Sequence, residues 1–146
     1  MLGAIFFLLC FGWQVVDLTN TTWLLTNGDD LSQHQAGWMF YRSSGWSFPF
    51  GIIQNLAYPF GVPITFTDSI PLFAIIFKMM SGILPAEFQY FGLFTLIGYF
   101  LQGGIGALII RRFTKSNMVA LVGPVFFVIS PVMLTRVFRH TALSAN

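Results

Sequence analysis

Residues 88–110 read FQYFGLFTLIGYFLQGGIGALII, a run of 23 residues without a charged side chain. As a helix, a run of this length crosses a hydrocarbon core of about 30 Å with some tilt. Two other charge-free runs cover 1–16 and 116–135. The three runs predict an all-α integral membrane protein with three transmembrane helices. A cleaved signal peptide is the alternative for the first run, although that run lacks a basic start and a small-x-small cleavage pattern.

The composition of the whole chain also favours a membrane protein. Of its 146 residues, 55% are hydrophobic and 8% are charged, and the mean hydropathy is +0.75. Soluble chains carry about 25% charged residues. The net charge of +2 comes from a few Lys and Arg that form no basic face, which argues against nucleic acid as a partner and leaves the lipid bilayer. The single Cys10 excludes a disulfide framework.

Charges are segregated along the chain. All five acidic residues lie between Asp17 and Glu87, whereas Arg111, Arg112 and Lys115 cluster between the second and third runs. The positive-inside rule makes this cluster cytoplasmic and the acidic loop extracytoplasmic. The predicted order is a span over 1–18, an outer loop with interfacial helices over 19–87, a span over 88–110, a cytoplasmic loop over 111–116, a span over 117–135 and an outer segment over 136–146.

The stretch 70–84 decides the number of spans. It is apolar but has only 15 residues, and Lys78 and Gly82 interrupt it. These features favour a helix that lies in the membrane interface, with Lys78 extending to the headgroups. A crossing helix is the alternative, but it would move the basic cluster outside the cell, against the positive-inside rule.

The outer loop carries polar residues that predict a functional site. A turn is predicted at 27–28, and the helix after it begins at Asp29 or Asp30. Gln33 and His34 follow Asp30 by three and four positions, so the three side chains share one helix face. Either aspartate could simply cap the helix and complement its dipole, but capping needs only one of the two.

Two other outer elements join this candidate site. Asp68 precedes the interfacial helix, where it either caps that helix or completes the site. Arg139 and His140 follow the third span on the outer side, where the positive-inside rule does not explain basic residues. They are candidates for binding the phosphate of a lipid headgroup or of a lipid-linked substrate, and nonspecific lipid contact is the alternative.

Several motifs together resemble an uncharacterised family of large bacterial polytopic membrane proteins. They are NGDDLSQHQAGW over 27–38, FPFG over 48–51, YPFG over 58–61, TDSIPL over 67–72, FQYFGL over 88–93 and RHTAL over 139–143. The layout of that family is similar to the GT-C superfamily of membrane glycosyltransferases. The resemblance implies a multi-pass protein of the bacterial inner (cytoplasmic) membrane. Because GT-C enzymes generally have more spans, it also implies that this chain is the N-terminal portion of a longer protein.

The resemblance further implies a reaction. GT-C enzymes transfer a sugar from a polyprenyl-phosphate-linked donor at the outer membrane face. A carboxylate would act as general base on the acceptor hydroxyl, and cations would stabilise the phosphate leaving group. A divalent metal is a possible cofactor, although the two aspartates are adjacent here rather than spaced as Asp-x-Asp. The catalytic candidates are Asp29, as the base, and Asp30; the substrate-binding candidates are Gln33, His34, Asp68, Arg139 and His140.

Two other classes of function stay open. One is a non-catalytic membrane protein that binds or translocates a lipid-linked precursor. Transport pathways usually place ionisable residues at membrane depth. The only acidic or basic residue within the predicted spans is Asp17, which is expected in the headgroup region at the end of the first. The other is an accessory membrane subunit that packs against a larger partner.

Overall fold

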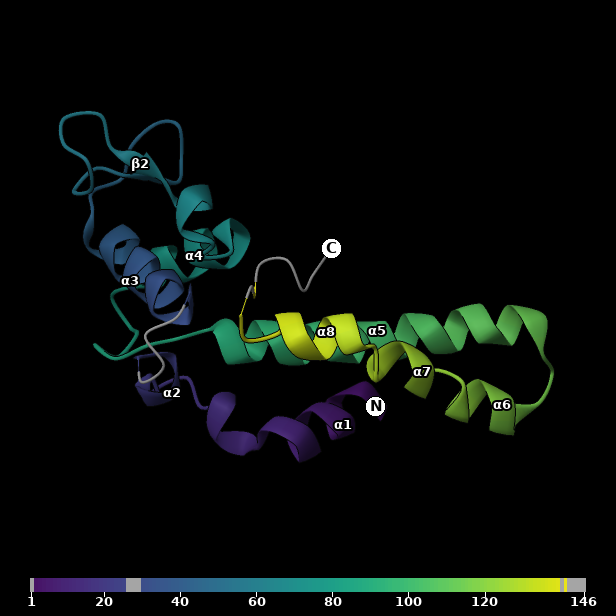
Figure 1. Ribbon diagram of the computed structural model, residues 1–146. Coiled ribbons are helices and arrows are strands. Elements are labelled where there is room, and N and C mark those ends of the chain that lie inside the picture. The colour runs from purple at the N-terminus through teal and green to yellow at the C-terminus, as the bar shows by residue number, and fades with distance from the viewer. Residues whose placement is uncertain (1, 26–29, 140, 142–146) are drawn as a thin grey trace.

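The computed structural model describes residues 2–25, 30–139 and 141 (Figure 1). The chain is mostly helical, with one short antiparallel pair of strands. The elements are α1 (Leu2–Phe11), η1 (Trp13–Val15), α2 (Thr22–Leu25), α3 (Asp30–Ser43), β1 (Ile52–Ile53), β2 (Val62–Pro63), η2 (Ile64–Thr67), α4 (Pro71–Met79), α5 (Phe91–Phe113), α6 (Asn117–Val122), α7 (Val125–Val128) and α8 (Pro131–Arg136).

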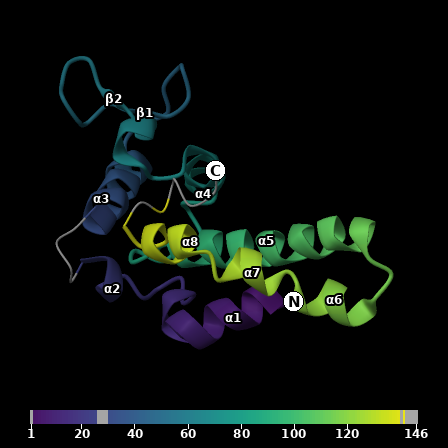
Figure 2. The same ribbon diagram turned by 45° about the vertical axis from the view of Figure 1, so that its right-hand side comes forward.

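The long helix α5 is the element against which the other apolar helices pack. α1 runs antiparallel to it, because Gly3 lies against Tyr99 and Gly103 while Val15 lies against Gly92. α7 and α8 lie beside α5 in both views (Figures 1 and 2). The buried core between these four helices consists of Phe7, Tyr99, Val128, Met133 and Val137.

In the described part of the chain, α5 alone is long and apolar enough to cross a membrane. It begins at Phe91 and runs through Arg111 and Arg112 to Phe113, so it takes in part of the predicted cytoplasmic loop. α1 has only 10 residues and is followed by Gly12, whose φ of 79° interrupts the helix before the predicted end of the first span. The arrangement with three spans therefore stays a prediction.

The third apolar run, over 117–135, does not form one continuous helix, and its role as a span stays a prediction. It is divided into α6, α7 and α8. Pro124 and Pro131 each lack the N–H that a continuous helix would need at that point. Pro131 is the first residue of α8, and Pro124 directly precedes α7.

The predicted outer loop folds into a compact unit, here called the loop unit (residues 19–25 and 30–87), at the N-terminal end of α5 (Figure 1). α3 lies inside this unit. Gln35 Nε2 and Trp38 Nε1 both donate to the carbonyl oxygen of Phe88, at 3.2 and 3.1 Å. The indole of Trp38 also packs edge-on against Tyr90, with ring centres 5.2 Å apart. These contacts fix α3 to the segment that leads into α5.

The predicted interfacial helix is α4, but the expected position of Lys78 is wrong. Its side chain is buried, and Nζ donates to Ser44 Oγ and to the Gly45 carbonyl oxygen, both at 3.1 Å. The ammonium also lies 4.0 Å from the centre of the Tyr41 ring. Burial lowers the pKa of the Lys78 ammonium, and the aromatic face offsets part of that desolvation cost. Lys78 therefore joins α4 to the end of α3.

Arg42 fixes the turn that follows α4. Its guanidinium donates to four carbonyl oxygens, those of Ser81, Leu84, Pro85 and Ala86, at 2.7 to 3.3 Å. We expect Arg42→Gln to lower the free energy of unfolding by roughly 1–2 kcal/mol, because these acceptors are partly exposed and return to water. Arg42→Lys should restore less than half of the loss, since an ammonium cannot reach four acceptors at once. Chemical unfolding in detergent, followed by tryptophan fluorescence, measures the free energy of unfolding of both variants. If Arg42→Lys had the same free energy of unfolding as the unmodified protein, the bridging role of Arg42 would be contradicted.

Candidate functional site

The segment 67–69 lies directly on α3 at Gly37. A Cβ atom at Gly37 would come within 2.4 Å of Thr67 Oγ1 and 2.6 Å of Ser69 Oγ, so the close approach requires glycine. Ser69 Oγ donates to the His34 carbonyl oxygen at 2.7 Å and lies 2.8 Å from Thr67 Oγ1. Tyr90 donates its hydroxyl hydrogen to the Ser69 carbonyl oxygen. The segment is thus held by α3 on one side and by the start of α5 on the other.

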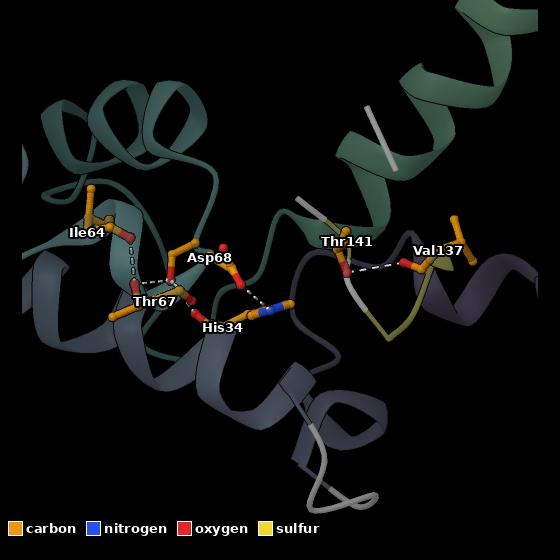
Figure 3. A network of polar contacts seen from close by, with 7 residues as sticks. His34, Ile64, Thr67, Asp68, Val137 and Thr141 are labelled. Carbon is orange, nitrogen blue, oxygen red and sulfur yellow. Dashed lines mark hydrogen bonds and ion pairs between the residues drawn. The ribbon is translucent and has the colours of Figure 1, made fainter. Parts of the chain in front are cut away.

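These contacts bring Asp68 to His34 (Figure 3). Asp68 Oδ2 lies 3.9 Å from His34 Nε2. That separation is longer than a hydrogen bond and is an ion-pair distance when the imidazole is protonated. The His34 side chain is 1% exposed, whereas that of Asp68 is 52% exposed. The pair therefore presents a carboxylate to solvent with an imidazole buried behind it.

The backbone around Asp68 is unusual. Asp68 and Ile70 both lie in the left-handed region, with φ of 51° and 50°. For a β-branched residue this conformation is rare and costs about 1–3 kcal/mol, so surrounding contacts must impose it. The alternative role of Asp68 as the cap of the following helix is wrong, because Ile70 occupies the N-cap of α4 and no side chain caps it.

The C-terminal segment returns to the loop unit. The ring of Phe138 lies 5.2 Å from that of Trp23, edge to face. Thr141 is buried, and its Oγ1 donates to the Val137 carbonyl oxygen at 3.1 Å (Figure 3). Arg139 lies between these residues and is exposed. A cationic side chain therefore lies at the same end of α5 as Asp68.

One family matches the whole chain. The profile described as a domain of unknown function (DUF6311) matches residues 1–146. The chain belongs to the DUF6311 family. No curated protein and no solved structure matches it. Neither comparison links this DUF6311 chain to the GT-C superfamily, so that resemblance stays a prediction.

The DUF6311 chain brings some of the predicted site residues together and separates others. His34 and Asp68 are neighbours. Asp30 is exposed and is the first residue of α3, which confirms the predicted start of that helix. Gln33 is exposed whereas His34 is buried, so the two side chains do not reach the same surroundings.

Two predicted residues, Asp29 and His140, lie outside the described residues. Their roles stay predictions. Within 2–25, 30–139 and 141, no group of three His, Cys, Asp or Glu side chains is placed to hold a metal ion. A divalent metal also stays a prediction, because Asp29, one of the two adjacent aspartates considered for it, lies outside that part of the chain.

Sequence reasoning missed the residues that position Asp68. These are Gly37, which permits the close approach, and Thr67, Ser69 and Tyr90, which hold the segment. The TDSIPL motif contains two of them and was the available signal. It could not indicate that the segment packs on α3, because the contact joins residues more than 30 positions apart.

Proposed function

We propose that this DUF6311 chain belongs to a multi-pass membrane glycosyltransferase. The proposed enzyme transfers a sugar from a polyprenyl-phosphate-linked donor to an acceptor outside the cytoplasm. The reaction takes place at the loop-unit end of α5. The observation that carries this proposal is the half-exposed carboxylate of Asp68 with the buried imidazole of His34 behind it.

In the proposed reaction Asp68 acts as the general base. Its carboxylate accepts the proton of the acceptor hydroxyl as that oxygen forms a bond to the anomeric carbon of the donor sugar. The bond between the anomeric carbon and the phosphate oxygen breaks, and its electron pair leaves with the polyprenyl phosphate. His34 orients the carboxylate. The sequence assigns the role of base to Asp29, and among the described carboxylates the geometry favours Asp68.

The leaving group is an anion, so it needs positive charge rather than a proton. Arg139 is exposed at the end of α5 where Asp68 lies, and a guanidinium can bind phosphate oxygens through two parallel hydrogen bonds. We assign Arg139 to the phosphate of the donor. His140 is the second candidate for this contact.

The proposed membrane placement is supported by the surface of α5 and of the helices beside it. Leu101, Ile105 and Leu108 are 49%, 53% and 68% exposed on α5, and Phe126 on α7 is 83% exposed. Apolar side chains exposed along a helix of 23 residues suit contact with lipid tails. With α5 across the bilayer, the loop unit lies at one membrane surface and the basic cluster at the other.

The decisive experiment measures sugar transfer directly. Bacterial membranes that contain the protein are incubated with polyprenyl-phosphate hexoses that carry a radiolabelled sugar, and matched membranes from a deletion strain serve as the control. We expect label to move into envelope material only when the protein is present and the donor is lipid-linked, not with a nucleotide sugar. No transfer in membranes that contain the protein, or equal transfer in the deletion strain, would refute the enzymatic proposal.

A further inference from the structure

A groove lies between α5 and α6. α6 lies at the opposite end of α5 from the loop unit (Figure 1). Its volume is about 440 Å³. Small and apolar side chains line most of it, and two polar side chains lie at one end. The main lining residues are Gly104, Ala107, Leu108, Arg111, Ala120 and Leu121.

The floor of the groove is open at Gly104. A Cβ atom there would meet no atom within 4 Å, whereas a Cβ at the adjacent Gly103 would lie 3.0 Å from the backbone of α1. Gly103 therefore serves helix packing, as small residues in membrane helices usually do. Gly104 makes no such packing contact. Because it has no side chain, it leaves room in the groove for an acyl chain.

The polar end of the groove is cationic. Arg111 Nη2 donates to Asn117 Oδ1 at 3.3 Å, which places the guanidinium at the groove. Arg112 and Lys115 are exposed nearby in sequence, and no acidic residue follows Glu87 anywhere in the chain. An anionic group is therefore the complement of this end.

We infer that the groove binds one anionic phospholipid of the cytoplasmic leaflet. One acyl chain of the lipid lies along the small residues between α5 and α6, and the lipid phosphate contacts Arg111. Arg112 and Lys115 contribute to the positive electrostatic potential at this end of the groove. Basic pockets between helices at the cytoplasmic surface are suited to such headgroups. The inference depends on the membrane placement proposed above, but not on sugar transfer, because it concerns the other end of α5.

Native mass spectrometry of the detergent-purified protein tests this inference. The protein is mixed with equal amounts of phosphatidylglycerol and phosphatidylcholine, which differ in headgroup charge. We expect one retained phosphatidylglycerol, with a preference of at least tenfold over phosphatidylcholine. The double variant Arg111→Gln, Arg112→Gln should weaken phosphatidylglycerol binding roughly twenty-five-fold, at about fivefold per cation.

A second variant separates the groove from simple surface charge. Gly104→Leu fills the groove and keeps every cation, so it should reduce retained phosphatidylglycerol at least tenfold. Gly82→Leu is the matched control, because a Cβ at Gly82 also meets nothing within 4 Å and lies outside the groove. Circular dichroism verifies folding, and Ala107→Leu replaces Gly104→Leu if the latter loses helicity.

Three results would overturn the inference. Equal retention of the two lipids would remove the headgroup preference. Unchanged phosphatidylglycerol binding by the folded groove-filling variant would mean surface attraction alone. No retained lipid in the unmodified protein would mean that a protein segment occupies the groove. None of these results depends on transferase activity, so failure here and failure of the proposed reaction are distinguishable.

Discussion

Asp68→Asn is expected to lower the rate of sugar transfer by a factor of about 10²–10⁴, the usual contribution of a general base. Asparagine has nearly the same size as aspartate and also tolerates the left-handed backbone, so the segment on α3 should stay in place. It lacks only the basic oxygen that accepts the proton. Initial rates of label transfer, measured with membranes that contain equal amounts of each variant, give the factor.

Glu87→Gln is the matched control for Asp68→Asn. Glu87 is exposed and accepts a hydrogen bond from Thr21 Oγ1 at 3.1 Å, which an amide oxygen can also accept. Glu87→Gln also removes one negative charge, but outside the site. The rate of sugar transfer should stay within about twofold of that of the unmodified protein, since exposed charges interact weakly. Asp29→Asn completes the comparison. If it abolishes transfer while Asp68→Asn does not, the base is Asp29, as the sequence predicts.

The features that were predictable from sequence depend on local signals. The helix that begins at Asp30 follows from a turn signal and an acidic first turn, both contained in a few residues. α5 follows from one uninterrupted apolar run. Both predictions use only residues close together in the chain, and backbone hydrogen bonding within a helix is local too. The observed start of α3 and both observed ends of α5 lie within a few residues of the expected positions.

The third apolar run shows a limit of predicting helices from hydropathy alone. Counting charges over 117–135 detects an apolar segment but not whether its backbone is continuous. The structure begins a new helix at Val125, immediately after Pro124, and another at Pro131. A proline weighs against a continuous helix even where hydropathy is uniform, so the two signals should be read together.

Lys78 illustrates a different limit. In an apolar stretch a lysine is expected to extend to the membrane surface. Here its partners Ser44 and Gly45 lie more than 30 positions earlier, and the ring of Tyr41 lies over the ammonium. Only the packing of α4 on α3 brings these groups together. The same packing places segment 67–69 on Gly37, so the site could be proposed from its motifs but not assembled from them.

Gly92→Ala is expected to have the largest effect on stability, about 3–5 kcal/mol in the free energy of unfolding. A Cβ atom at this position would lie 1.8 Å from the carbonyl oxygen of Val15. The clash is with backbone, so no side-chain rotation relieves it, and η1 must move away from the start of α5. That movement also breaks hydrogen bonds of the buried Gln89, whose Nε2 donates to the carbonyl oxygens of Val15 and Asp17 at 3.0 and 2.6 Å.

Gly98→Ala makes the same chemical change on the same helix and should have the opposite sign. A Cβ at Gly98 meets only Met133 Cε, at 3.8 Å, which is an ordinary contact. Alanine is favoured over glycine inside a helix by about 1 kcal/mol, so this variant should be neutral or slightly stabilised. Thermal unfolding in detergent, followed by circular dichroism, compares the two. Similar stabilities would mean that η1 does not pack against α5 at Gly92, and the contact that joins segment 15–17 to the start of α5 through Gln89 would then be wrong as well.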